Sequence, residues 1–314
     1  MKRNADGKAE DHSVTNNGLK SIDFGDNTGE ASAFYPTATI AIVGLGLMGG
    51  SLALALRGFC AHLLGVDRDP SVVELALERQ IVEAATSDLA ELLPQADLVV
   101  IAVPVRASLE ILSHLPELHP GYPIVMDLGS TKRAVLSAMA RLPARFDPVG
   151  GHPMCGKETG TLSNAEAGLY RQAPFALVPL ARTTPRARQV ASELVALVGA
   201  QPLWLNAVEH DRWVAATSHL PHLLATALML STPCESAPMA GPGFRSTSRL
   251  AAGSAEMKID IFATNGLAVL EALTRFRGQL DTLEDLLQHG DLEAMQRLLD
   301  LGAERRQAFL AEER

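Results

Sequence analysis

A glycine-rich turn near the start of the chain lies between a short apolar run and a helix-like segment. The turn is GLGLMG at residues 44–49, directly after the β-rich run Thr39–Val43. In this context the first glycine makes the tight turn, the second lets a pyrophosphate approach the backbone, and the third lets helix and strand pack closely. The free N–H groups at the start of the helix would then bind the phosphates. The turn predicts a dinucleotide site on a Rossmann-type fold.

A carboxylate stands where a dinucleotide-binding fold holds the ribose. Asp67 follows the apolar run Leu63–Val66, at about the expected separation from the turn. It would accept hydrogen bonds from ribose hydroxyls and repel a 2′-phosphate, which predicts NAD. The adjacent Arg68 could pair with a 2′-phosphate, so NADP is the alternative. The expected cofactor contacts are Gly44, Gly46, Leu47, Met48, Gly49, Asp67 and Arg68.

From residue 37 onward, apolar runs alternate with amphipathic stretches. The runs Leu98–Val103 and Phe175–Val178 are apolar throughout, and Pro123–Asp127 is apolar up to its final aspartate, which is typical of strands buried on both faces. Strands that alternate with helices predict a doubly wound α/β sheet of the Rossmann type over residues 37–205.

Beyond residue 205 only helical periodicity is found. We expect a long helix over Glu209–Leu230, kinked by Pro221, and further helices over Met257–Leu287 and Asp291–Glu312. Residues 206–314 are therefore predicted to form an all-α domain. Because long apolar helices of this kind often pack against a second copy, we expect a homodimer.

The composition excludes several classes of protein. The net charge of −9 over 314 residues argues against nucleic-acid binding, which needs a basic face. The 3 cysteines are too few and too scattered for a disulfide framework or a zinc site, so no metal is expected. Residues 1–36 are polar, without an apolar signal segment, and are expected to be a disordered tail. No apolar run reaches the length of a membrane span. The few, scattered cysteines fit a reducing cytosol, so we expect a cytoplasmic protein.

A histidine follows the strand-like run Phe146–Val149. His152 comes after two glycines and before Pro153, which predicts a loop at the carboxyl end of the sheet, where open α/β folds bind ligands. An imidazole there can accept the proton of a hydroxyl while hydride leaves its carbon. A loop histidine that caps a backbone carbonyl is the alternative.

Ser130, after the run that ends at Asp127, has two interpretations. As an N-cap residue it would hold the start of the next helix. At the same edge of the sheet it would also reach the imidazole or a substrate hydroxyl. Lys132 is either a solvated helix residue or an anion contact.

Histidines and an arginine recur in the helical half. His219 and His222 are 3 residues apart in the segment SHLPH, which begins at Ser218, and they share one helix face. They fit a buried core pair or the lining of an anionic pocket, whereas a metal site lacks a third ligand. Arg249 is either a surface residue or a bidentate partner for a carboxylate, since its guanidinium fork matches one.

Taken together, these segments resemble a known family. The chain beyond about residue 37 is similar to the prephenate and arogenate dehydrogenases of tyrosine biosynthesis. The segments that carry the resemblance are GLGLMGG at 44–50, DLGSTK at 127–132, GHPMCG at 151–156, SHLPH at 218–222 and FRSTSRLAA at 244–252. Generic Rossmann enzymes lack this set.

The resemblance implies a Rossmann domain followed by a helical dimerisation domain. It implies NAD-dependent oxidative decarboxylation of prephenate to 4-hydroxyphenylpyruvate, with arogenate as a further substrate. In that chemistry His152 would accept the proton of the ring 4-hydroxyl, and Ser130 would orient it. The implied contacts to the dicarboxylate substrate are Ser218, His219, His222 and Arg249, the last to a carboxylate.

Three other activities fit parts of the pattern. A 4-amino-4-deoxyprephenate dehydrogenase of an antibiotic pathway would use the same site. A β-hydroxyacid dehydrogenase shares the glycine turn but uses a catalytic lysine in its second domain, where this chain has histidines and an arginine. A redox-sensing NAD-binding module would not need His152 and Arg249 to converge on the nicotinamide.

Overall fold

The computed structural model describes residues 34–157 and 160–311. Of the expected tail, residues 1–33 lie outside the described residues, but its last residues belong to a short helix, α1 (Phe34–Thr37). Tyr35 is buried there, and its hydroxyl donates a 2.7 Å hydrogen bond to the carbonyl oxygen of Val190. The tail expected over residues 1–36 therefore includes residues that are folded, because the aromatic side chain of Tyr35 packs into the core.

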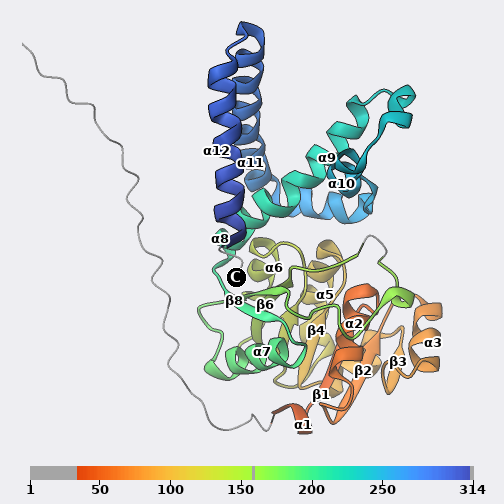
Figure 1. Ribbon diagram of the computed structural model, residues 1–314. Coiled ribbons are helices and arrows are strands. Elements are labelled where there is room, and N and C mark those ends of the chain that lie inside the picture. The colour runs from red at the N-terminus through yellow and green to blue at the C-terminus, as the bar shows by residue number, and fades with distance from the viewer. Residues whose placement is uncertain (1–33, 158–159, 312–314) are drawn as a thin grey trace, which may run out of the picture. The chain divides into compact units, whose positions relative to one another are not determined.

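An eight-stranded sheet forms the first part of the described chain (Figure 1). Its strand order is β3-β2-β1-β4-β5-β6-β7-β8, and neighbours are parallel except β6 and β7. The order reverses between β1 and β4, which is where open α/β sheets bind ligands, outside the carboxyl ends of the strands. The strands are β1 (Thr39–Val43), β2 (His62–Val66), β3 (Ala84–Thr86), β4 (Leu98–Ile101), β5 (Ile124–Asp127), β6 (Asp147–Pro153), β7 (Pro174–Pro179) and β8 (Gln201–Trp204).

Both faces of this sheet are buried. In β1, Ile40 and Ile42 join one hydrophobic core, while Ala41 and Val43 join the other. Strands covered on both faces must be apolar throughout, which is the pattern that the sequence showed. The helices of this part are α2 (Leu47–Leu56), α3 (Pro70–Glu78), α4 (Leu89–Leu92), α5 (Val105–Leu118), α6 (Arg133–Met139) and α7 (Pro185–Leu197), with 3₁₀ turns at Leu93–Gln95 and Leu162–Asn164.

Strand β6 is longer than the sequence predicted. It continues past Val149 to Pro153, so His152 lies in a strand, paired with Ala176 of β7, and not in a loop. The preceding glycines, Gly150 and Gly151, allow Lys132 and Asp127 to approach the backbone of this strand closely. A Cβ on Gly151 would stand 2.7 Å from the carbonyl oxygen of Asp127. Glycine inside a strand therefore marks tight packing here, and the expectation of a loop was wrong.

The chain beyond β8 is helical, as predicted, but the expected helix Glu209–Leu230 is interrupted. It consists of α8 (Ala207–Val214), a π-helical turn (Ala215–His219) and α9 (Leu220–Ser231). Pro221 lies in the first turn of α9, directly after the π-helical turn, so its missing N–H falls where the helical hydrogen-bond pattern changes. The other segments are 3₁₀ turns at Cys234–Met239 and Arg249–Ala252 and the helices α10 (Pro242–Ser248), α11 (Ala255–His289) and α12 (Leu292–Ala311).

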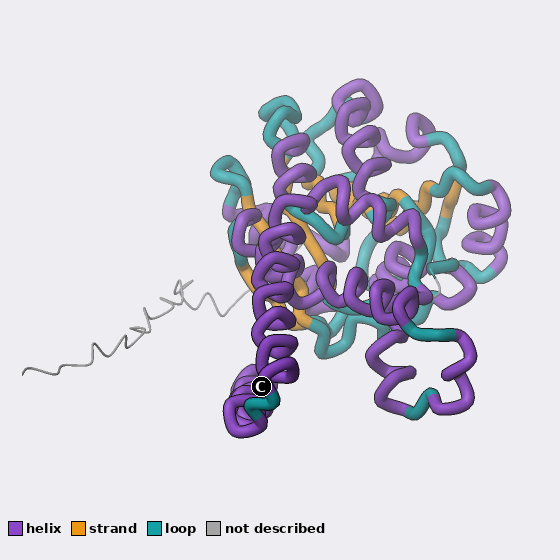
Figure 2. Tube along the Cα trace, turned by 90° about the horizontal axis from the view of Figure 1, so that it is seen from above, coloured by secondary structure: helices purple, strands orange, loops and turns teal. Residues whose placement is uncertain are grey.

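Helices α11 and α12 lie side by side (Figures 1 and 2). Gly290 ends α11 with a φ of +65°, the left-handed conformation that glycine favours at a helix end. None of the helices in the described ranges is long and apolar enough to cross a membrane. Large apolar side chains that remain exposed on these two helices are Met257, Ile259, Leu267, Leu270, Leu280, Leu287, Leu292, Leu299, Leu301, Phe309 and Leu310.

Candidate active site

The glycine turn between β1 and α2 leaves no room for other residues. Gly44 has a φ of +94°, and a Cβ there would stand 2.7 Å from the carbonyl oxygen of Ala102. A Cβ on Gly49 would collide with the carbonyl oxygen of Gly44. Glycine at both positions therefore lets α2 start close against the end of the strand.

The start of α2 presents backbone N–H groups that cannot bond within the helix. Leu47 N–H donates a 2.9 Å hydrogen bond to the carbonyl oxygen of Gly160, so the chain itself engages this group. Gly46 lies close to the same carbonyl oxygen, since a Cβ added to Gly46 would stand 3.0 Å from it. Met48 and Gly49 carry the next N–H groups at this positive end of the helix dipole, which favours a phosphate.

Asp67, at the end of β2, is joined to the glycine turn. Its Oδ2 accepts the N–H of Leu45 at 2.7 Å, and its Oδ1 accepts the N–H of Asp69 at 3.0 Å. Each oxygen keeps a further lone pair for a ribose hydroxyl. Arg68 beside it is exposed. The turn, the helix start and this carboxylate fit a dinucleotide in the arrangement that the sequence predicted.

His152 lies at the carboxyl end of β6, and its side chain is buried. Its Nδ1 is 2.9 Å from Nε2 of His210. Burial first, and then the neighbouring His210, Lys132 and His219, hold the pKa of His152 well below its ordinary value. The imidazole is therefore neutral at neutral pH, which is the state that can accept a proton.

Asp211 joins His210 to the start of α6. Its Oδ1 lies 2.8 Å from Nδ1 of His210, and its carboxylate accepts the N–H groups of Lys132 at 2.7 Å and Arg133 at 2.9 Å. Burial acts to raise the pKa of Asp211, but these hydrogen bonds outweigh burial and lower it. Asp211 is thus a buried carboxylate that caps one helix from another.

Ser130 does not cap α6, contrary to one of its two interpretations. The N-cap position belongs to Lys132, and the capping group is the carboxylate of Asp211. The Ser130 hydroxyl has no hydrogen bond to another residue in the part of the chain that the structure describes. Ser130 is half-buried in the turn after β5, at the edge of the sheet that also holds His152.

Lys132 is not a solvated helix residue, and the anion that it contacts is a carboxylate of the protein. Its side chain is fully buried, and its Nζ forms an ion pair with Asp127 at the end of β5. Asp127 also accepts the N–H groups of Gly129 at 2.9 Å and Gly151 at 3.3 Å. A buried charge is costly unless an opposite charge is paired with it. Lys132 and Asp127 provide that pairing for each other, so both charges can lie in the core.

His219 is buried in the π-helical turn, next to Ser218. Its Nδ1 lies 3.2 Å from the amide nitrogen of Asn265, which also donates to the carbonyl oxygen of Asp211. Nδ1 is therefore the acceptor, and Nε2 carries the proton. This Nε2 is buried and has no hydrogen-bond partner among the described residues. Burial lowers the pKa of His219 to about 4, so the ring is neutral with an unused donor.

His222 and Arg249 lie near one another. His222 Nδ1 is 3.3 Å from the carbonyl oxygen of Leu250. Burial lowers the pKa of His222, the Leu250 carbonyl opposes this, and the positive charges of Lys258 and Arg249 lower it further. Arg249 is exposed. The charge of a protonated His222 would also lower the pKa of His219.

Sequence reasoning missed His210, Asp211 and Asn265. A signal existed for the first two. His210 is four residues before Val214, and Asp211 is four residues before Ala215, so each pair lies on the same buried helix face. Polar residues on a buried helix face need partners, which points to a network. Asn265 offered no comparable signal, since its partners come from a different helix.

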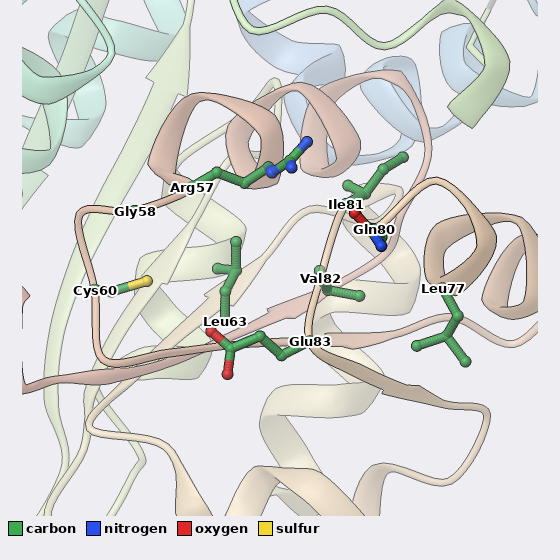
Figure 3. A pocket seen from close by; sticks show the side chains of 9 residues that line it. All are labelled: Arg57, Gly58, Cys60, Leu63, Leu77, Gln80, Ile81, Val82 and Glu83. Atoms are coloured by element: carbon green, nitrogen blue, oxygen red, sulfur yellow. The ribbon is translucent and has the colours of Figure 1, made fainter.

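A surface pocket of about 390 Å³ lies away from these residues (Figure 3). It opens beside the amino ends of β2 and β3, at the opposite edge of the sheet from the glycine turn. It is lined by Arg57, Gly58, Cys60, Leu63, Leu77, Gln80, Ile81, Val82 and Glu83. None of the predicted site residues is among them, so this pocket is not the candidate active site.

A Rossmann-type sheet with a glycine turn, a carboxylate after β2 and a buried, neutral imidazole at the same edge has the parts that an NAD-dependent dehydrogenase requires. Comparison with known families agrees. Residues 51–203 match the family profile "Prephenate dehydrogenase, nucleotide-binding domain", and residues 206–301 match "Prephenate dehydrogenase, dimerization domain". The chain belongs to the prephenate dehydrogenase family.

Individual relatives support this membership. The prephenate dehydrogenase of Bacillus subtilis (strain 168) is 30% identical over 268 residues, which cover 81% of this chain and 71% of the relative. The crystal structure of prephenate dehydrogenase from A. aeolicus in complex with hydroxyphenyl propionate and NAD+ has a TM-score of 0.79 at 28% identity, over 88% of this chain and 99% of that one. The structure of Synechocystis arogenate dehydrogenase has a TM-score of 0.75 at 31% identity, over 86% and 99%. The family, the fold class and the NAD-dependent dehydrogenase activity predicted from the sequence are confirmed.

Proposed function

We propose that this chain catalyses the NAD-dependent oxidative decarboxylation of prephenate to 4-hydroxyphenylpyruvate. The observation that carries the proposal is the buried, neutral imidazole of His152 at the edge of the sheet that also holds the glycine turn. A base in this position is suited to take the proton of the ring 4-hydroxyl. The A. aeolicus relative, solved with hydroxyphenyl propionate and NAD+, supports a ring-bearing carboxylate as the ligand of such a site.

The protein's part in the reaction is to bind, orient and move one proton. The nicotinamide supplies the hydride acceptor when NAD is bound. His152 takes the hydroxyl proton as the electrons of the C4–H bond leave as hydride, and C4–O becomes a carbonyl. The ring carboxylate then leaves as carbon dioxide, and its bonding electrons flow into the dienone to form the aromatic ring. The phenol oxygen regains the proton from protonated His152.

Other residues surround this centre in the proposal. Ser130, half-buried at the same edge, orients the imidazole and the hydroxyl. Ser218 and His219 line the substrate pocket, with the Nε2–H of His219 as a donor that still lacks a partner among the described residues. His222 lines it near Arg249, and Arg249 binds a carboxylate. The cofactor contacts are those expected from the sequence: Gly44, Gly46, Leu47, Met48, Gly49, Asp67 and Arg68.

Arogenate is a second candidate substrate. The observation in its favour is the Synechocystis arogenate dehydrogenase, which is 31% identical to this chain. Arogenate differs from prephenate by an amino group in place of the side-chain keto group, which is remote from C4. The same base and the same hydride transfer would therefore serve both compounds.

An absorbance assay of NADH formation tests the proposed function. The purified chain is given NAD or NADP with either prephenate or arogenate. We expect turnover with prephenate and a preference for NAD, because the Asp67 carboxylate repels a 2′-phosphate. No turnover with either substrate would overturn the proposal. Faster turnover with NADP would overturn the role given to Asp67 and would assign the 2′-phosphate to Arg68.

We also propose that the chain works in the cytoplasm as a homodimer, with residues 37–205 as the nucleotide domain and 206–314 as the dimerisation domain. The match of residues 206–301 to a dimerization domain supports this. So do the exposed apolar side chains of α11 and α12, which a partner would cover. Sedimentation equilibrium should give twice the chain mass of 33.4 kDa. A mass of one chain at micromolar concentration would contradict the dimer.

A further inference from the structure

A line of buried hydrogen bonds ends on His152. His152 Nδ1 is 2.9 Å from His210 Nε2, and His210 Nδ1 is 2.8 Å from Asp211 Oδ1. The two imidazole rings have centroids 5.1 Å apart and planes inclined by 63°. His210 and Asp211 are each only 1% exposed, so water does not compete for these contacts.

The partners in this line determine which nitrogen carries each proton. Asp211 accepts the N–H groups of Lys132 and Arg133, its pKa is lowered, and as a carboxylate it can only accept. His210 must therefore donate its Nδ1–H to Asp211. Burial lowers the pKa of His210, so its ring is neutral and its Nε2 is an acceptor. The Nδ1 of His152 must then be the donor, which leaves the lone pair of His152 on Nε2.

We propose that His210 and Asp211 are positioning residues that hold His152 in the Nδ1–H tautomer, with its Nε2 lone pair available to the substrate hydroxyl. Both residues are almost fully buried, so they act through His152 and not by contact with the substrate. The inference rests on the proposed function in that His152 is taken as the base. Without a fixed tautomer, the ring would spend part of its time with an N–H toward the hydroxyl, and in that state it cannot accept the proton.

The same arrangement also stabilises the protonated base. When the hydroxyl proton reaches Nε2, His152 becomes an imidazolium whose Nδ1–H still donates to His210. The carboxylate of Asp211, one ring further along, compensates part of the positive charge through the polarised His210 ring. His210 and Asp211 thus orient the base before proton transfer and stabilise its charge afterwards, as the third group of a catalytic triad does.

The tautomer can be measured without any turnover. In protein labelled with ¹⁵N-histidine, the protonated and unprotonated ring nitrogens of a neutral imidazole have well-separated chemical shifts. The chain has 9 histidines, and the His152 signals are those that disappear in His152→Asn. We expect a protonated Nδ1 and an unprotonated Nε2 for His152. The reverse assignment would overturn the inference, whether or not the chain oxidises prephenate.

Two substitutions of His210 separate positioning from support of the fold. His210→Asn places an amide N–H near the position of Nδ1, so it keeps the donor to Asp211 and loses the acceptor for His152. His210→Gln reaches the position of Nε2 and offers a carbonyl oxygen to His152. We expect kcat to fall about 10- to 100-fold in His210→Asn, a usual cost of losing the partner that orients a functional histidine. KM for prephenate and NAD affinity should hardly change, and His210→Gln should recover part of kcat.

His114→Asn is the matched control, because His114 is an exposed histidine on α5, and it should leave every value unchanged. A wild-type kcat in His210→Asn would overturn the inference. If His210→Asn fails to fold, the ¹⁵N shifts of the unmodified protein and the kcat of His210→Gln still test the inference. Failure of the unmodified chain to oxidise either substrate contradicts the proposed function instead, and the ¹⁵N shifts distinguish the two failures.

Discussion

His152→Asn should lower kcat about 10²- to 10⁴-fold, the range that a positioned acid–base group contributes. Asparagine keeps a polar group that faces His210 but cannot take up a proton. KM for prephenate and the affinity for NAD should change far less, because neither requires proton transfer. Steady-state kinetics with prephenate and a separate titration with NAD measure these quantities. A kcat close to that of the unmodified protein would remove His152 from the chemistry.

The pH dependence of kcat/KM gives an independent check in the unmodified protein. The base must be unprotonated, and burial together with His210, Lys132 and His219 lowers the pKa of His152. We therefore expect kcat/KM to stay constant as the pH falls through about 6.5, the ordinary pKa of histidine, and to decline only below it. A decline that begins above that value would show that another group is the base.

Arg249→Ala should raise KM for prephenate about 10- to 150-fold, since a hydrogen bond to a charged group contributes about 1.5–3 kcal/mol. Arg249→Lys should raise KM by less, because lysine keeps the charge but loses the planar fork that binds both carboxylate oxygens. NAD affinity should be nearly intact in both variants. Each variant is titrated with NAD and with prephenate in separate experiments.

The neighbouring Arg245 provides the control for charge and position. Arg245 is also exposed, and its Nε donates to the carbonyl oxygen of Ala240 at 3.2 Å. Arg245→Ala should leave KM for prephenate unchanged. If NAD binding collapses in Arg249→Ala while KM for prephenate holds, Arg249 serves the cofactor or the fold, and the substrate carboxylate lies elsewhere.

Contacts between the helical part and the sheet edge build the candidate site. Asp211 on α8 caps α6, and Asn265 on α11 donates to the backbone of Asp211 and to His219. The helical part therefore contributes to the candidate site itself, because it holds the group behind His152. A substitution at Asn265 removes its contacts with Asp211 and His219, so it should disturb the candidate site although Asn265 itself is buried within the helices.

Several features of this protein follow from the sequence by itself. The apolar runs predict the strands because both faces of the sheet are covered, as Ile40 and Ala41 show by packing into opposite cores. The glycine turn and Asp67 are recognisable because a positive φ at Gly44 and a carboxylate at the end of β2 are local requirements of dinucleotide binding. These signals depend on neighbours along the chain, so no tertiary contact is needed to interpret them.

Where local signals allow two answers, tertiary contacts decided. The glycines before His152 looked like a loop, but the carbonyl oxygen of Asp127 requires a glycine at 151 within a strand. Lys132 looked solvated or free to bind anions, but Asp127 from the neighbouring strand end pairs with it in the core. Ser130 looked like a cap, but a carboxylate from α8 fills that position. In each case the deciding atom lies on another element of the fold.

The line from Asp211 through His210 to His152 is the clearest case of what only the tertiary structure decided. His152 is on a strand and His210 is on a helix, 58 residues apart in the chain, so no periodicity relates them. Their contact exists because α8 packs over the carboxyl edge of the sheet, where burial removes water and leaves each polar atom to find a protein partner. The sequence made His152 the candidate base, and the packing of the helical part places His210 and Asp211 behind it.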